Sequence, residues 1–309
     1  MIVKLLANYN NGNANIKLFD NGTRVVKCDD PVTNLEFPLS IDLCITKYCN
    51  RGCLFCYNNS GVNGKHGNIL ELPIIDSIPP GVEIAIGGGS ITTHPDLKDF
   101  LKKLKNKGLI ANITVSQGEF IENVSLINEF IEEDLIHGMG ISFKEPNDIL
   151  WRAIADNRNC VVHLIAGIHT KEVLDYLSDF GLKILILGYK DLGRGEYYHD
   201  TLRDKIDTNI NWLKDHLEDY KGKFRVISLD NLAVEQLEAK RLVTEEKWKE
   251  YFQGEDGSIS CYIDGVNETI SISSLESEND ALPLGNDIKE DFAKIKALKE
   301  EREVNDTIK

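Results

Sequence analysis

The sequence predicts an α/β protein built on a parallel β-sheet, and two observations support this fold class. Six short apolar segments have the character of buried strands, and segments with helical periodicity separate them. Strands that alternate with helices form parallel sheets with right-handed crossovers. A partly closed barrel and an open doubly wound sheet both satisfy this pattern. The six predicted strands are residues 40–46, 83–86, 110–115, 139–143, 160–166 and 182–187.

Helical periodicity predicts a helix after most of these strands. Pro95 suits the first turn of a helix over residues 95–107, because the first residue of a helix needs no amide donor. Residues 224–229 form a candidate seventh strand. The remaining predicted helices cover residues 121–133, 147–156, 171–180, 201–220, 232–242 and 287–303.

Both ends of the chain are predicted to carry small β elements. Residues 15–18 and 24–27 are strand candidates joined by Asp20-Asn21-Gly22, in which Asn and Gly tolerate the positive φ of a tight turn. Residues 258–263 and 269–273 resemble a second hairpin. We therefore divide the chain into an N-terminal β appendage (1–38), a central α/β region (39–230) and a C-terminal extension of helices and a hairpin (231–309).

Composition limits the classes of partner. The formal net charge of the 309 residues is -15, and an acidic surface repels phosphate backbones, so nucleic acid is not an expected partner. No apolar run is long enough to span a bilayer, and no basic segment followed by an apolar stretch opens the chain. We expect a cytoplasmic protein without a membrane partner.

Cysteine usage points to metal chemistry. The number of cysteines is odd and no export signal is visible, so a disulfide framework is the weaker interpretation. Three of the seven fall between residues 49 and 56, and the others are scattered singly. The seven are Cys28, Cys44, Cys49, Cys53, Cys56, Cys160 and Cys261.

Cys49, Cys53 and Cys56 follow directly after the first predicted strand of the parallel sheet. A tight loop with these spacings points three thiolates at one centre, and three thiolates hold three irons of a four-iron cubane while the fourth iron stays open. The alternative is a non-catalytic zinc or iron–sulfur protein with a structural or regulatory role. Zinc needs a fourth ligand, for which His66 or Cys44 is available, but no second ligand pair at a regular distance is present.

The segment Cys49-x-x-x-Cys53-x-Phe55-Cys56 resembles the motif of the radical S-adenosylmethionine superfamily. The resemblance implies a partial (β/α)6 barrel, one 4Fe-4S cluster on the three cysteines, and reductive cleavage of S-adenosylmethionine to a 5′-deoxyadenosyl radical. That radical abstracts hydrogen from a substrate, which the sequence does not identify. The resemblance also implies Phe55 against the adenine and an electron donor such as flavodoxin or ferredoxin.

A glycine run, Gly87-Gly88-Gly89 followed by Ser90, ends the second predicted strand. Taken alone it is weak evidence, since it also suits an ordinary turn or an anion-binding nest. Beside the cysteines it resembles the Gly-Gly-Glu-Pro-type motif of the same superfamily, whose exposed backbone receives the amino group of S-adenosylmethionine. Glycine suits this role because a side chain blocks close approach of a ligand. Gly89-Ser90 stands where Glu-Pro is common, so only the backbone role is implied.

The resemblance also implies cofactor and substrate contacts near the ends of the later strands, on less specific motifs. Ser142, and less so Ser116, lies where polar groups of the superfamily meet the ribose or methionine of the cofactor, although serine is common near strand ends. Lys190 follows strand six, where the backbone contacts adenine, and it or Arg194 is suited to a substrate carboxylate or phosphate. A solvated loop charge is the alternative for Arg194. His163 is predicted to be a strand residue with a satisfied ring.

The remaining four cysteines indicate which subgroup of the superfamily this sequence resembles. Cys28, Cys44, Cys160 and Cys261 are too few and too scattered for the cysteine-rich auxiliary-cluster domain of many peptide-modifying relatives. We therefore expect a single cluster and a subgroup without that domain. Fold and motif leave the reaction on the substrate open.

Overall fold

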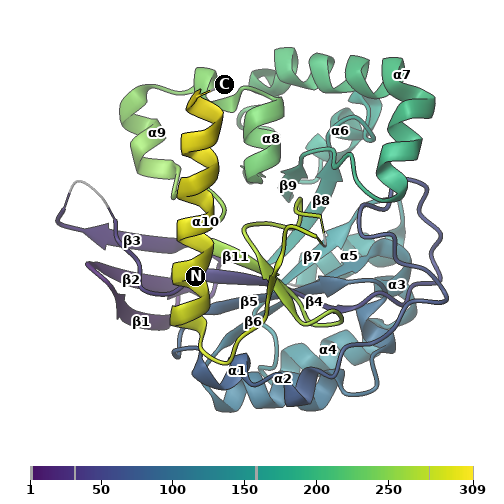
Figure 1. The fold of residues 1–309 in the computed structure, drawn as a ribbon. Coiled ribbons are helices and arrows are strands. Elements are labelled where there is room, and N and C mark those ends of the chain that lie inside the picture. The colour runs from purple at the N-terminus through teal and green to yellow at the C-terminus, as the bar shows by residue number, and fades with distance from the viewer. Residues whose placement is uncertain (1–2, 31–32, 157–158, 278, 309) are drawn as a thin grey trace.

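Two β-sheets organise the chain in the computed structural model, which describes residues 3–30, 33–156, 159–277 and 279–308 (Figure 1). The smaller sheet has the order β1-β2-β3 and the larger has the order β10-β9-β8-β7-β6-β5-β4-β11-β12-β13. The strands from β4 to β10 are all parallel to their neighbours. The prediction of an α/β fold with a parallel sheet is therefore confirmed.

The six predicted strands and the candidate seventh are all present. Each strand from β5 to β10 lies beside the strand that precedes it in the chain, so six successive strands extend the sheet on one side of β4. A doubly wound sheet distributes its strands on both sides of the first one. The strands are β4 (Ser40–Thr46), β5 (Glu83–Gly88), β6 (Ile110–Ser116), β7 (Gly138–Ser142), β8 (Cys160–Ile165), β9 (Lys183–Leu187) and β10 (Val226–Leu229).

The predicted C-terminal hairpin is formed by β11 (Ser260–Asp264) and β12 (Thr269–Ser271). β11 also pairs parallel with β4, and β13 (Leu282–Pro283) pairs with β12, so the hairpin extends the large sheet. Alternating apolar and polar residues predict a strand but do not show which strand it pairs with, and the pairing of β11 with β4 was not predicted. The domain boundaries at residues 38 and 230 stay predictions, and residues 1–2, 31–32 and 309 lie outside the described residues.

The helices largely follow the predicted ranges, with several differences, among them the unpredicted short helix α1 and the early end of α8 at Gln236. Residues 121–133 form parts of two helices, because Asn123 leaves helical geometry at φ -122°. α7 begins at Arg194, ahead of the predicted start, and is kinked at Leu202; α9 was not predicted. The α-helices are α1 (Ile74–Ser77), α2 (Leu97–Asn106), α3 (Gln117–Glu122), α4 (Val124–Glu132), α5 (Asp148–Asp156), α6 (Lys171–Ser178), α7 (Arg194–His216), α8 (Asn231–Gln236), α9 (Glu245–Tyr251) and α10 (Ile288–Ile308).

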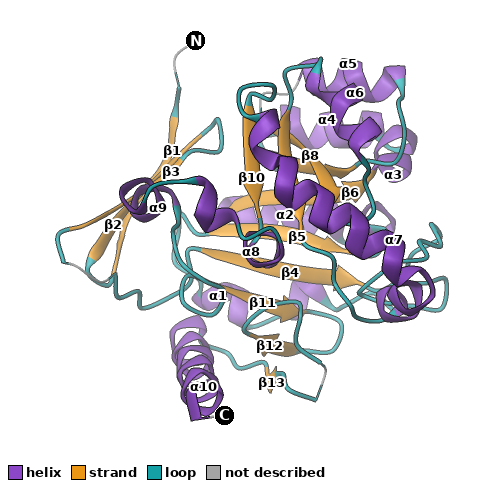
Figure 2. Cartoon of the chain, turned by 90° about the horizontal axis from the view of Figure 1, so that it is seen from above, coloured by secondary structure: helices purple, strands orange, loops and turns teal. Residues whose placement is uncertain are grey.

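The two faces of the large sheet differ in chemistry. Alternate residues such as Ile84 and Ile86 are fully buried in a core that includes Phe100 of α2, and we call this side the apolar face. Figure 1 shows α2 and α4 below β5 and β6, and Figure 2 shows β11, β12 and β13 continuing the large sheet beyond β4. The residues between them form the polar face, which carries Asp42, Glu83, Gly87, Asn112, Thr114, Ser142, His163 and Leu185.

The N-terminal sheet lies against the amino ends of the large-sheet strands. It consists of β1 (Leu5–Asn11), β2 (Ala14–Phe19) and β3 (Arg24–Cys28). Arg24 forms an ion pair with Glu83 at the start of β5. Lys183, the first residue of β9, donates to the backbone oxygen of Asn21 in the β2–β3 turn at 2.8 Å. The strands' carboxyl ends, where α/β proteins place their ligands, lie away from these contacts.

None of the helices in the described part of the chain combines the length and the apolar character needed to cross a bilayer.

Candidate functional site

The three clustered cysteines lie on one loop at the carboxyl end of β4. This cysteine loop, residues 47–65, is folded back on itself, because Cys49 donates its amide to the Gly61 oxygen at 3.0 Å. A bridge between Tyr48 and Gly61 supports the same fold-back. Cys53 is exposed, Cys49 and Cys56 are half-buried, and all three are free thiols. The loop thus presents thiols at the end of the sheet where a ligand is expected.

Two donors point at the Cys49 sulfur. The Ser90 hydroxyl and the Arg51 amide each donate to its Sγ at 3.5 Å. Ser90 is fully buried and directly follows the glycine run, so β5 supplies one of the two donors. Hydrogen bonds to a cysteine sulfur stabilise its thiolate, the form that binds metal.

Gly88 and Gly89 are required by the packing of two backbones. Gly88 has φ +123°, and a Cβ there would lie 2.4 Å from the Thr46 oxygen. A Cβ on Gly89 would lie 2.1 Å from the Tyr48 oxygen. The amides of Gly89 and Ser90 donate to the same two oxygens at 2.7 and 2.8 Å. The sequence left open a ligand role, an ordinary turn and an anion-binding nest for these glycines, and the structure gives Gly88 and Gly89 a packing role against the cysteine loop.

Gly87 differs from its two neighbours. A Cβ built on Gly87 would have no heavy atom within 4 Å, although the residue lies within β5 and pairs with Cys44 of β4. Of the three glycines, Gly87 therefore borders open space on the polar face. An added methyl group there would contact no other part of the protein.

The three thiols influence one another electrostatically. Burial, followed by the neighbouring Cys56 and Cys49, raises the pKa of the Cys53 thiol, while Arg194 acts in the opposite direction. Mutual repulsion of this kind is relieved when a cation pairs with all three sulfurs. Thiolates are the ligands of iron–sulfur clusters and of structural zinc. Within residues 3–30, 33–156, 159–277 and 279–308, no three His, Cys, Asp or Glu side chains are arranged to hold a single metal ion.

The two candidate fourth ligands for zinc have other partners. Cys44 is buried and accepts a hydrogen bond from Asn58 at 3.5 Å. The Nδ1 of His66 lies 2.8 Å from the Thr46 hydroxyl. Both candidate fourth ligands are therefore engaged elsewhere, which disfavours a closed four-ligand zinc site.

Lys190 lies over the polar face. Its Nζ donates to the Ser274 hydroxyl at 2.6 Å and sits 4.1 Å from the centre of the Tyr57 ring. Burial lowers the pKa of Lys190, and the carboxylates of Asp230 and Asp42 oppose that shift. The side chain thus brings a cation to the polar face; the expectations from the sequence were a backbone contact with the cofactor and a side-chain contact with a substrate carboxylate or phosphate.

Asp42 is a candidate residue that the sequence analysis missed. It keeps exposed surface although β4 lies between β5 and β11, which shows that the polar face is open at this position. Surrounding protein nonetheless raises the pKa of Asp42 to about 6, and Lys190 opposes the shift. The available signal was a carboxylate inside an otherwise apolar strand, a residue type that strands disfavour.

The remaining predicted contacts are placed as follows. Ser142 ends β7 on the polar face and is half-buried. Ser116 accepts the Glu119 amide at 3.2 Å as the N-cap of α3, which is a structural role. The Phe55 ring packs edge-on against Tyr198 of α7, with centroids 5.9 Å apart.

His163 does not have the satisfied ring that we predicted. Its Nδ1 is buried, with no hydrogen-bond partner among the described residues. The ring fills the space left by Gly140 on the neighbouring strand, where a Cβ would lie 2.2 Å from its Cε1. Burial lowers the pKa of His163 to about 4, so the ring is neutral at pH 7. An unpaired nitrogen is therefore available on the polar face.

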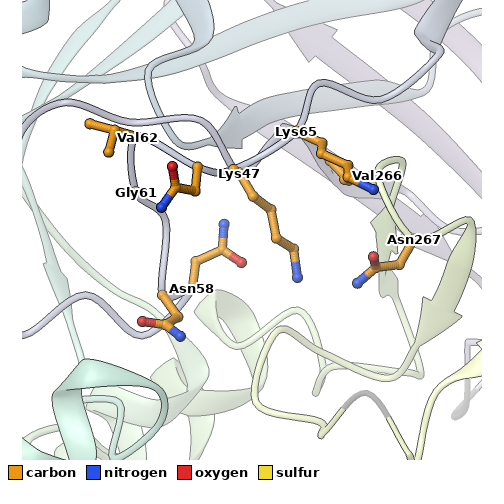
Figure 3. A pocket seen from close by; sticks show the side chains of 10 residues that line it. Lys47, Asn58, Gly61, Val62, Lys65, Val266 and Asn267 are labelled. Atoms are coloured by element: carbon orange, nitrogen blue, oxygen red, sulfur yellow. The ribbon is translucent and has the colours of Figure 1, made fainter.

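A cavity of about 630 Å³ lies elsewhere, between the second half of the cysteine loop and the β11–β12 turn (Figure 3). Lys47, Asn58 and Asn267 are among its lining residues, and Lys47 forms an ion pair with Asp264 at 3.0 Å. None of the three clustered cysteines or the glycine run lines it. We place the candidate site at the strands' carboxyl ends on the polar face, because the cysteine loop and the open Gly87 both lie there and Gly87 does not line this cavity.

Comparison with known proteins gives limited matches. No protein-family model and no curated protein matches the sequence. Among solved structures, SuiB from Streptococcus suis bound to S-adenosylmethionine aligns at 15% identity with a TM-score of 0.47, over 77% of this chain and 58% of SuiB. SuiB bound to the precursor peptide SuiA aligns at 16% identity with a TM-score of 0.48, over 77% and 60%. The chain spans about three fifths of SuiB, and scores at this level assign neither family nor function.

Proposed function

We propose that this protein is a radical S-adenosylmethionine enzyme that binds one 4Fe-4S cluster, and that its parallel sheet is the partial (β/α)6 barrel of that superfamily. One observation carries the proposal. A loop with three free thiols packs directly, through backbone hydrogen bonds, on a glycine turn with open space at Gly87. Both features lie at the carboxyl ends of adjacent parallel strands, β4 and β5.

Each residue has a proposed role that follows from its place. Cys49, Cys53 and Cys56 hold the cluster, and Ser90 donates to the first of these sulfurs. The backbone at Gly87 receives the amino group of S-adenosylmethionine, where no side chain intervenes. Phe55, Gly88, Gly89, Ser142 and Lys190 complete the proposed cofactor contacts. When bound, the cluster supplies the electron that cleaves S-adenosylmethionine to the 5′-deoxyadenosyl radical.

The polar face is the proposed surface for the substrate. Asp42, His163 and Lys190 bring a carboxylate, a neutral imidazole and an ammonium group to one side of the sheet. Asp42 is exposed and Lys190 is half-buried on this face, and the buried Nδ1 of His163 has no partner among the described residues, which favours a polar ligand beside them. The electron donor is proposed to approach the exposed side of the cysteine loop, where Leu54 is 67% exposed beside Cys53.

The direct test is anaerobic reconstitution with iron and sulfide. The wild type is expected to be brown with about four irons per chain, and to release 5′-deoxyadenosine when given dithionite and S-adenosylmethionine. Cys53→Ala is expected to lose both properties, because one of the three protein ligands is gone. Cys160→Ala is the matched control, since Cys160 is buried in the core, and it should retain both.

A colourless, zinc-replete wild type that forms no 5′-deoxyadenosine would contradict the proposal. A structural metal site makes a further, separate prediction, because metal binding then contributes to the free energy of folding. Cys53→Ala would in that case lower the melting temperature sharply. A folded but inactive Cys53→Ala protein is the result expected from the enzyme.

A further inference from the structure

Arg194 makes an unusual set of contacts with the cysteine loop. Its guanidinium donates from Nε to the Cys53 oxygen at 3.0 Å, and from Nη2 to the Ser60 oxygen at 2.8 Å. Nη1 donates to the Asn59 side chain at 3.2 Å, and the Arg194 amide donates to the Cys56 oxygen at 3.1 Å. One residue thus binds the loop at four positions, two of them on cysteines.

The residues beside Arg194 fit closely against the same loop. Gly193 has φ +57°, and a Cβ there would lie 2.5 Å from the Tyr57 oxygen. A Cβ on Gly195 would lie 2.5 Å from the Lys190 oxygen and 3.5 Å from the Phe55 oxygen. The first turn of α7 therefore docks on the segment between Cys53 and Ser60, and Arg194 is the side chain that binds it.

The two halves of the cysteine loop have different anchors. Cys49 donates its amide to the Gly61 oxygen and accepts a hydrogen bond from the Ser90 hydroxyl. Cys49 lies shortly after β4 and Ser90 shortly after β5, so this half of the loop is held at the ends of those two strands. Cys53 and Cys56 are bound through their own oxygens to Arg194, which comes from the far side of the sheet after β9. Loss of the Arg194 side chain would therefore remove the anchors at Cys53 and Ser60, on either side of Cys56, and leave the first half of the loop in place.

We propose that Arg194 is a positioning residue that fixes Cys53 and Cys56 relative to Cys49. The sequence analysis considered Arg194 as a substrate contact or a solvated charge, and its contacts with the loop argue against both. The link to cluster assembly rests on the proposed function, whereas the positioning of the two cysteines does not. A planar guanidinium with donors in a fixed fork suits this task, because one side chain reaches several oxygens at once.

The test measures thiol alkylation in metal-free, reduced protein with iodoacetamide, read at each cysteine by mass spectrometry. In Arg194→Met, Cys56 is expected to react about fivefold faster or more, because the side-chain bonds to the Cys53 and Ser60 oxygens on either side of it are lost, whereas the backbone bond to the Cys56 oxygen remains. Cys49 in the same sample is the internal control and should stay within about twofold. Arg194→Lys keeps the charge but not the fork, and should give a smaller increase at Cys56.

Arg24→Met is the matched control for a general loss of stability, since Arg24 forms its ion pair with Glu83 away from the loop. It should lower the melting temperature without accelerating Cys56. Unchanged Cys56 reactivity in folded Arg194→Met, or in Arg194→Lys if the first variant does not fold, would overturn the proposal. Equal acceleration in Arg24→Met would overturn it as well. Reconstitution of the same samples tests the proposed function separately, since a wild type without iron leaves the alkylation result intact.

Discussion

The two faces of the large sheet are formed by the same strands but differ in packing and exposure. On the apolar face, Ile84 and Ile86 are fully buried against the helices. On the polar face, Asp42 stays exposed, His163 has an unpaired nitrogen, and Gly87 borders open space. Burial of apolar area stabilises a fold, whereas unpaired polar groups cost stability. The comparison teaches that stability resides on one face and proposed function on the other.

The largest expected difference is between matched leucine substitutions on the two sides. Leu104 of α2 is fully buried in the core, and Leu104→Ala is expected to cost about 2–5 kcal/mol of unfolding free energy. Leu185 lies on the polar face and is only half-buried, so Leu185→Ala should cost about 1 kcal/mol. Urea unfolding of both variants gives the two values. Equal losses would show that the polar face is packed like a core.

The next difference separates two glycines of the same run. Gly87→Ala is expected to leave the free energy of unfolding within about 0.5 kcal/mol of wild type, because its new methyl group meets no protein atom. Gly89→Ala should cost about 1–3 kcal/mol, because its Cβ would lie 2.1 Å from the Tyr48 oxygen.

Binding of S-adenosylmethionine tests whether the proposed cofactor pocket lies at Gly87. Gly87→Ala is expected to weaken S-adenosylmethionine binding about tenfold, followed by the electron paramagnetic resonance signal of the reconstituted protein. A fully folded Gly87→Ala protein with wild-type affinity would place the cofactor elsewhere. Gly88→Val would be a less informative test, because φ +123° and the Thr46 oxygen at 2.4 Å strain the backbone in any case.

The smallest expected effect concerns Asp42 and pH. Its pKa rises from 3.8 to about 6 on folding, so the folded state binds more protons between these values. The stability contributed by protonated Asp42 is therefore present below about pH 4 and lost as the pH rises through 6. Asp42→Asn should remove that slope and raise the melting temperature at pH 7.5 by about 2–4 °C. A lower melting temperature for Asp42→Asn would mean that the carboxylate stabilises the fold.

The sequence predicted what depends on local pattern. The strands from Ser40 to Leu187 follow from apolar runs, and the three cysteines follow from their spacing. It did not predict β1, whose Asn-rich segment is a strand only because β2 pairs with it. It also missed the role of Arg194, which depends on contacts 134–141 residues away in the chain. Gly88 and Gly89 were identified, but the oxygens that require them are visible only in the fold.

The pairing of β11 with β4 has a consequence for how the chain is made. Ser260 lies opposite Ser40, so the strand that carries the cysteine loop acquires one of its two neighbours only after most of the chain has left the ribosome. Until then one edge of β4 presents unpaired amide and carbonyl groups, which are prone to pair with other chains. Early termination before residue 260 would therefore leave β4 with an unpaired edge next to the cysteine loop, and such fragments should depend on chaperones to stay in solution.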